Sequence, residues 1–168
     1  MSNEQVVLVN KNGKSLGLKE KIFAHKNPVS LHKAISVLIF DKEKVLIQKR
    51  AKNKKTWPLF WSNTCCSHPR GNESFQKAAE RRLFEEMGIK TKLRRKFRII
   101  YQDKFNKDWG ENEYDWVFIG NYSGKLNPDP REIMKLKWIS LKKLREDIKK
   151  NPKKYTPWFK IILTKLEK

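Results

Sequence analysis

Cysteine is nearly absent from this chain of 168 residues: there are two, Cys65 and Cys66, and they are adjacent. Adjacent cysteines are poorly placed to bridge each other, so the sequence excludes a disulfide-rich scaffold and indicates free thiols in a reducing, cytoplasmic compartment. No apolar run approaches the roughly 20 residues that a membrane span needs. Residues 1–10 lack the basic and apolar segments of a secretory signal, so we expect neither secretion nor a membrane span.

Arginine is also scarce, with nine Arg beside 30 Lys, although the formal net charge is +21. A charge of this size attracts anions such as phosphorylated metabolites, nucleic acids or acidic membrane surfaces. The lysines are spread along the whole chain, which is typical of a solvated basic surface, and specific base recognition usually relies on Arg. We therefore expect no specific nucleic-acid partner, while the charge is compatible with non-specific binding.

The rest of the composition indicates one folded domain without repeats or Gly/Ser linkers. Hydrophobic residues make up 38% of the chain, with nine Phe and six Trp, which is enough for a core. Apolar patterning and turn residues predict strands at 33–40, 44–49, 97–105, 114–121 and 136–139, and helices at 73–87, 141–149 and 153–167. Residues 50–61 form a basic loop that contains Trp, and 127–130 form another. This order predicts an α/β fold, a mixed sheet with helices on both faces.

The predicted helix over 73–87 has clear end signals. Asn72 is a candidate N-cap and Gly88 a candidate stop. Arg82 and Glu86 are four residues apart and share one helix face. A different face repeats apolar residues at helical spacing and should point to the core: Phe75, Ala79, Leu83 and Met87.

The three histidines, His25, His32 and His68, are the first candidates for a functional site. Glu111 and Glu113 follow later and alternate, so they share one face of an extended segment, as joint ligands must. Histidine with carboxylate is the ligand set of a divalent metal. Cys66, two residues from His68, adds a nucleophile, acid or base beside that metal.

These residues belong to motifs with a known counterpart. Trp57-Pro58 with Trp61, the segment 63–69, the segment 110–114 and the seven-residue spacing of the first two histidines match a family pattern. Over 21–158 the chain resembles the type I isopentenyl-diphosphate isomerases of the Nudix superfamily. The resemblance implies a Nudix-type α/β/α sandwich as a single domain over 1–168, with 1–20 partly an extension and the catalytic core at about 21–158.

The helix resembles a degenerate Nudix box, with Glu73 and the run 81–89 at matching spacing. A hydrolytic box would have Glu in place of Arg82 and Gly in place of Ser67. Nudix hydrolases gather carboxylates on this helix to hold Mg²⁺ and activate water on a diphosphate. Arg82 removes one ligand and adds a positive charge, which favours binding of a diphosphate without its cleavage.

The family's reaction converts isopentenyl diphosphate to dimethylallyl diphosphate. Protonation of the alkene gives a tertiary carbocation, which then loses a proton from the other side, so an acid and a base must face the substrate. The pocket must exclude water, and an aromatic face can stabilise the cation.

The resemblance also implies roles at matching positions, and we expect a monomer. The acid and base groups would be Cys66, Glu113 and Tyr101. A metal, Mn²⁺, Mg²⁺ or Zn²⁺, would be held by His25, His32, His68, Glu111 and Glu113. A diphosphate-bound Mg²⁺ would be held by Glu86. The substrate would be contacted by Lys21, Arg50, Lys54, Arg82, Trp61 and Trp158.

Simpler interpretations of single residues remain open. Cys66 can be a small buried hydrophobe, Glu113 a solvated charge, and Arg82 with Glu86 a surface ion pair. Trp158 can pack the last helix on the sheet. Two other functions are compatible with parts of the pattern, a Nudix pyrophosphohydrolase and a basic nucleic-acid-binding protein on a Nudix scaffold.

Overall fold

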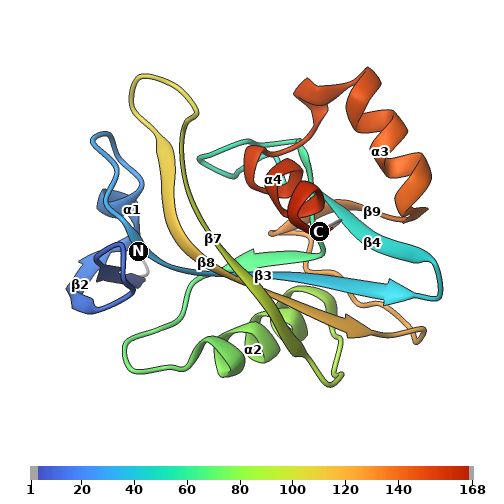
Figure 1. Cartoon of the computed structure of the whole chain (residues 1–168), viewed down its shortest axis with the longest axis horizontal. Coiled ribbons are helices and arrows are strands. Elements are labelled where there is room, and N and C mark those ends of the chain that lie inside the picture. The colour runs from blue at the N-terminus through green and yellow to red at the C-terminus, as the bar shows by residue number, and fades with distance from the viewer. Residues whose placement is uncertain (1–3, 167–168) are drawn as a thin grey trace.

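One mixed sheet forms the centre of the molecule (Figure 1). The computed structural model describes residues 4–166, and within them the sheet has nine strands. They are β1 (Gln5–Val9), β2 (Ser15–Glu20), β3 (His32–Asp41), β4 (Lys44–Arg50), β5 (Trp61–Ser62), β6 (Cys65–Ser67), β7 (Arg94–Lys104), β8 (Gly110–Asn121) and β9 (Ile133–Ser140). The order is β2-β1-β3-β4-β5, with β6 and β8 also paired to β3, β7 to β8, and β9 to β4. The pair of β3 with β8 is parallel, and the other pairs are antiparallel.

Helices cover both faces of the sheet, which confirms the predicted α/β architecture. The short α1 (Lys21–Ala24) follows β2; α2 (Phe75–Met87) lies on one face, and α3 (Leu141–Lys150) and α4 (Pro157–Leu166) lie on the other (Figure 1). The central strand β3 serves both layers because its side chains alternate. Ile35, Val37 and Ile39 join the core beneath α2, whereas Leu38 joins the core with α3 and α4.

The predicted N-cap of α2 was wrong. The helix begins at Phe75, and Ser74 is its N-cap, because the Ser74 side chain accepts a hydrogen bond from Lys77 N at 3.2 Å. Asn72 lies two residues too early to receive that N–H. Gly88 does end the helix, in the left-handed conformation at φ 69°.

Other predicted elements exist with shifted ends. β8 begins at Gly110 rather than at 114, so the acidic pair Glu111 and Glu113 is part of the strand. The final helix begins at Pro157, after a 3₁₀ turn at Pro152–Lys154, rather than at 153. The hairpin β1–β2, the helix α1 and the short strands β5 and β6 were missed, because each is too short or too exposed for periodicity to reveal.

Strand register brings distant parts of the sequence together. In the parallel pair His32 of β3 lies opposite Glu113 of β8, and in β7 Tyr101 is the partner of the same glutamate. On the other side of β3, Cys66 of β6 is paired with Ser36. No helix within residues 4–166 is long and apolar enough to cross a membrane.

The cap of α2 yields the first prediction. Ser74→Ala should lower the free energy of unfolding by about 1 kcal/mol, because the N–H of Lys77 loses its acceptor. Asn72→Ala is the matched control and should change stability little. Urea unfolding followed by circular dichroism measures both, and an equal loss in the two variants would contradict the assignment of the cap.

Candidate functional site

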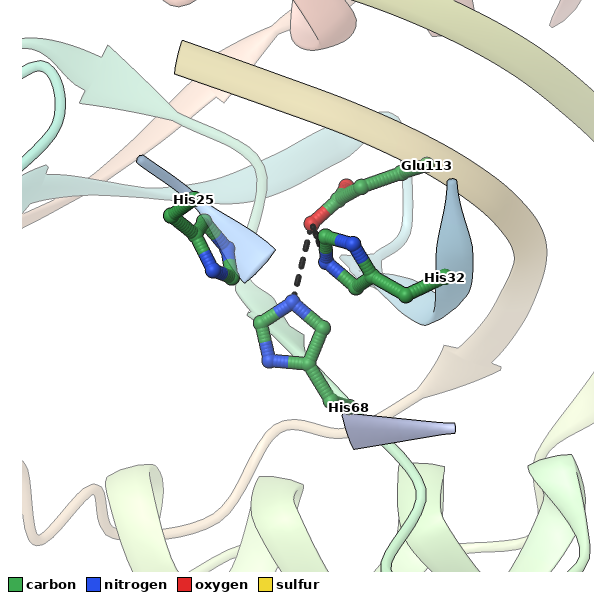
Figure 2. A group of neighbouring side chains, drawn as sticks. All are labelled: His25, His32, His68 and Glu113. Carbon is green, nitrogen blue, oxygen red and sulfur yellow. Dashed lines mark hydrogen bonds and ion pairs between the residues drawn. The ribbon is translucent and has the colours of Figure 1, made fainter. Parts of the chain in front are cut away.

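Three histidines and one glutamate converge in a buried cluster (Figure 2). His25 follows α1, His32 opens β3, His68 follows β6 and Glu113 lies in β8. One potential ligand atom from each lies within 4.8 Å of the others, and the imidazole centroids are 4.7 to 5.1 Å apart. Segments from four parts of the chain thus meet at one point, whereas Glu111, the fifth predicted ligand, lies outside this group and contacts His25 at 2.9 Å.

The tautomers of two histidines suit a metal. His25 Nδ1 and His32 Nδ1 lie 2.7 Å from the main-chain oxygens of Lys21 and Ser30, so each Nδ1–H donates to a carbonyl. Each Nε2 therefore keeps its lone pair toward the centre of the cluster, which is the usual arrangement of a metal-binding imidazole.

Some buried polar atoms at the centre lack hydrogen-bond partners within residues 4–166. They include His32 Nε2 and Glu111 Oε2, the latter 2.9 Å from His25 Nε2 but without hydrogen-bond alignment. Buried polar atoms are rarely left unsatisfied because their desolvation is costly. A divalent cation among these nitrogen and oxygen atoms would satisfy them, so the residues present fit a metal.

The two glutamates are oriented by hydroxyl donors behind them. Thr56 Oγ1 donates to Glu111 Oε1 at 2.6 Å. Tyr101 donates its phenolic hydrogen to Glu113 Oε2 at 2.5 Å, which leaves Glu113 Oε1 facing His68 Nε2 at 2.9 Å. Such outer partners fix the direction of a ligand and support its basicity.

The electrostatics of the cluster favour a neutral imidazole at His68 beside ionised carboxylates at Glu111 and Glu113. Burial, and then the neighbouring His32, lower the pKa of His68 well below its usual value. Burial opposes the charge on Glu111, yet His25 keeps the pKa of that carboxyl below its usual value. Burial likewise opposes ionisation of Glu113, but its contact with His32 lowers its pKa. Two ionised carboxylates beside a neutral imidazole are what metal binding requires.

The pKa of His25 is shifted in the opposite direction to that of His68. Burial disfavours its charged form, but the carboxylate of Glu111 more than compensates and raises the pKa of His25.

Cys66 is a half-buried thiol beside an aromatic wall. Trp158 Nε1 donates toward Cys66 Sγ at 3.2 Å, and Sγ lies 2.9 Å from Asn63 Oδ1. Burial raises the pKa of Cys66 to about 12, although Arg50 opposes this shift. Cys66 is therefore a thiol, able to donate a proton, at neutral pH.

A cavity of about 970 Å³ connects these groups. At one part of its wall are Cys66, His68, Tyr101, Glu113 and Trp158. The cations that the sequence assigned to a diphosphate are also in its lining: Lys21, Arg50, Lys54 and Arg82. The Cys66 thiol, His25, His68, Glu113 and these four cationic side chains therefore face a common space.

Arg82 and Lys54 are linked through carboxylates. Arg82 donates to Glu86 at 2.6 Å and to Glu132 at 3.3 Å, and Lys54 forms an ion pair with Glu132. Glu86 is buried, and burial raises its pKa despite the contact with Arg82. Because Arg82 keeps its charge even when buried, this part of the cavity wall stays cationic.

The other two cations are held differently. Lys21 pairs with Glu4 at 3.0 Å. Arg50 donates to the main-chain oxygens of Thr56 and the following residue at 2.9 and 3.1 Å. Its guanidinium lies 5.2 Å from the ring centroid of Trp158, a cation–π contact that also orients the indole.

Comparison with known proteins assigns the family. Residues 30–159 match the NUDIX domain. A protein of Aromatoleum aromaticum named isopentenyl-diphosphate Delta-isomerase 1 is 42% identical over 97% of this chain and 92% of its own length. A protein of Nocardia farcinica named isopentenyl-diphosphate Delta-isomerase is 39% identical over 94% and 91%. The chain belongs to the isopentenyl-diphosphate Delta-isomerase family.

Solved structures agree on the fold. A crystal structure from Deinococcus radiodurans has a TM-score of 0.69 and 14% identity over 86% of this chain and 88% of that one. A MutT NUDIX hydrolase from Burkholderia pseudomallei has a TM-score of 0.66 and 20% identity over 80% and 96%. This isomerase-family chain therefore has the Nudix α/β/α arrangement expected from its sequence.

Two residues expected at the site do not line the cavity. His32 is wholly buried behind the other histidines, where only its Nε2 faces the cluster. Trp61, expected to help close the pocket, packs against the core with α3 and α4. Its main-chain oxygen accepts a hydrogen bond from Thr156 N at 2.9 Å, directly before α4, which carries Trp158.

Several polar residues around this family's site had no sequence-based assignment. Asn63 lies inside the motif segment 63–69, so the motif itself was a signal for it. Thr56 and Glu132 come from loops without local pattern. Ser36 and Asp115 are buried on neighbouring strands and share a hydrogen bond of 2.7 Å, and burial raises the pKa of Asp115 well above its usual value. Only the pairing of β3 with β8 reveals the contact between Ser36 and Asp115.

The cluster predicts metal binding that depends on its outer partners. Thr56→Val should weaken metal affinity by roughly 10- to 100-fold, because Glu111 loses its orienting hydroxyl. Thr91→Val is the control, since Thr91 bonds the main chain at Asn121, the opposite end of β8. Metal titration of chelator-treated protein measures both, and equal affinities in the Thr56 variant and the wild type would contradict the site.

The Cys66 environment predicts a shifted alkylation profile. In metal-free Cys65→Ala protein, the rate of reaction with iodoacetamide should keep rising about tenfold per pH unit up to about pH 10.5, because only the thiolate reacts. The sign follows from burial, which disfavours the thiolate and raises the pKa of Cys66 from its usual 9.0 to about 12. A plateau near the usual value would show that Cys66 is solvated.

Proposed function

We propose that this protein converts isopentenyl diphosphate to dimethylallyl diphosphate. The observation that carries the proposal is the shared cavity, in which a thiol and a tyrosine-bonded glutamate face the same space as four cations. The family membership supports the same reaction, because the relatives are named for it.

The strand order supports proton transfer from two directions. Cys66 is carried by β6 and Glu113 by β8, and these strands pair with opposite sides of β3. Both side chains line the cavity. One group protonates the double bond to form a tertiary carbocation, and the other removes a proton from the neighbouring carbon. Acid and base catalysis of this kind needs both groups within reach of the substrate.

Glu113 is suited to accept a proton beside Tyr101. The phenolic hydroxyl donates to Glu113 Oε2, and burial raises the pKa of Tyr101 well above its usual value. Tyr101 therefore remains protonated and orients the ionised carboxylate of Glu113, which accepts the proton that the carbocation loses. The Cys66 thiol supplies the proton that the alkene gains from the other side of the substrate.

Aromatic rings form the wall where positive charge would develop. Trp158 stands edge-on to Trp57 with centroids 5.5 Å apart, and Tyr101 lies 6.0 Å from Trp158. Their faces exclude water, which would otherwise trap the cation, and their electron density stabilises positive charge.

The metals have separate proposed places. His25, His32, His68, Glu111 and Glu113 would hold Mn²⁺, Mg²⁺ or Zn²⁺, and this donor set fits octahedral coordination. Glu86 would hold a Mg²⁺ that also binds the diphosphate, since Mg²⁺ uses few carboxylates together with substrate oxygens. When bound, these ions supply positive charge that keeps Glu113 ionised and neutralises the diphosphate.

Lys21, Arg50, Lys54 and Arg82 would bind the diphosphate. Hydrolysis of the diphosphate is not expected from this arrangement. Arg82 replaces a carboxylate of the hydrolytic Nudix box and neutralises Glu86 by direct contact at 2.6 Å. Without that carboxylate, and with Arg82 paired to Glu85, Glu86 and Glu132, fewer free metal ligands remain to activate a water molecule on the diphosphate.

The reaction can be tested with isopentenyl diphosphate, Mg²⁺ and D₂O, followed by NMR. Wild-type protein should form deuterated dimethylallyl diphosphate, whereas Cys66→Ala and Glu113→Gln should each lose at least roughly 100-fold in rate, because each removes a proton-transfer group. Cys65→Ala is the matched control and should stay active, since Cys65 is buried outside the cavity lining. Intact substrate without deuterium in metal-loaded wild type, or full activity in Cys66→Ala, would overturn the proposal.

A further inference from the structure

Asn63 is a wholly buried amide that touches two groups of the site without lining the cavity. Its Nδ2 donates to the main-chain oxygens of Val37 at 3.2 Å and Cys65 at 2.8 Å. Because both partners are carbonyls, only the nitrogen end of the amide can face them. The oxygen end, Oδ1, is therefore held toward Cys66.

Asn63 Oδ1 collects hydrogen bonds from side chains around the thiol. Cys66 Sγ is 2.9 Å away, Trp158 Nε1 3.2 Å and Ser62 Oγ 3.0 Å. The indole N–H of Trp158 also lies 3.2 Å from Cys66 Sγ. One oxygen atom thus sets the positions of both the thiol and the indole.

No other nearby oxygen within residues 4–166 is so well placed for the Cys66 hydrogen. The hydroxyls of Ser36 and Ser62 lie 3.9 and 3.8 Å from Sγ. Both distances are about 1 Å longer than the 2.9 Å from Sγ to Asn63 Oδ1. The S–H bond therefore points to Asn63 Oδ1, the shortest of the thiol's contacts.

We propose that Asn63 is a positioning residue. Its amide oxygen orients the Cys66 thiol and holds the indole of Trp158 in place beside that thiol. The proposal rests on the proposed function, in which these two side chains act on the hydrocarbon part of the substrate. Without Oδ1, the thiol rotates among its rotamers and the indole loses an anchor. A displacement of about 1 Å at a reacting group can reduce a rate by about 100-fold.

The effect should appear in the chemical step rather than in binding. The four cations proposed to bind the diphosphate have no hydrogen bond to the Asn63 side chain among the described residues. Asn63→Ala should therefore lower kcat by about 100-fold and leave KM within about twofold.

Thr64→Val is the matched control. Thr64 is the next residue, equally buried, and its hydroxyl also makes two main-chain hydrogen bonds, to Ile39 N at 2.9 Å and Leu46 O at 2.6 Å. Its side chain makes no hydrogen bond to Cys66 or Trp158 within residues 4–166. Both variants should lose thermal stability, but Thr64→Val should keep kcat.

A spectroscopic measurement distinguishes a change in the orientation of the Cys66 thiol from a general loss of stability. The infrared S–H stretching band of Cys66 is obtained by subtracting the spectrum of Cys66→Ala from that of the wild type, and hydrogen bonding to oxygen lowers its frequency. The wild-type band should lie below that of a free thiol. It should move upward in Asn63→Ala and stay in place in Thr64→Val.

Three outcomes would overturn the proposal. The S–H band could stay unmoved in Asn63→Ala, a rise in KM could account for the whole loss of kcat/KM in that variant, or Thr64→Val could lose kcat to the same extent. If Asn63→Ala fails to fold, the wild-type difference spectrum decides, because a band at the free-thiol frequency also overturns it. The infrared result does not depend on turnover. A failure of isomerisation itself, seen as an inactive wild type, is therefore distinguishable from a failure of this inference.

Discussion

The parallel pairing of β3 with β8 is the constraint on which the site depends. Nine consecutive residue pairs in this register, from His32 opposite Glu113 to Phe40 opposite Asn121, join segments that are far apart in the chain. A slip of one residue would turn Glu113 to the other face of the sheet. It would also move this glutamate away from His32, its partner on β3. The buried apolar residues of β3 hold the register, because both of its faces are packed under helices.

The same packing buries ionisable side chains at the site, which disfavours their charged forms. Histidines and carboxylates gather in a space where burial disfavours charge, and several of their atoms have no hydrogen-bond partner among the described residues. A bound cation would resolve this conflict and would link folding of the strands to metal binding. Cys66 lies beside this cluster and is stabilised differently. Burial keeps it protonated, and its hydrogen-bond partners Asn63 and Trp158 are neutral. Charged and neutral proton carriers thus coexist across one cavity.

Parts of this arrangement followed from the sequence because they depend on short-range rules. The alternation of Glu111 and Glu113 predicted a shared face, and the helix periodicity of Ala79, Leu83 and Met87 predicted the buried side of α2. Local rules failed where two candidates compete. Asn72 and Ser74 are both good N-caps, and only the observed start of α2 selects Ser74. The strand β2 alternates only over Leu16 and Leu18, both exposed, which is too short a pattern to reveal a strand that forms by pairing with β1.

By itself, the sequence determined the kinds of chemistry available: three histidines and two spaced carboxylates for a metal, a cysteine in a distinctive motif, and an Arg where a hydrolytic Nudix box has Glu. Tertiary structure alone decided which atoms meet. Glu132 joins Lys54 to Arg82, and Asn63 turns its oxygen toward Cys66 and Trp158. These contacts depend on strand register and on the docking of α4. Both are set by packing between segments up to 95 residues apart, and no local pattern encodes the geometry of such long-range packing.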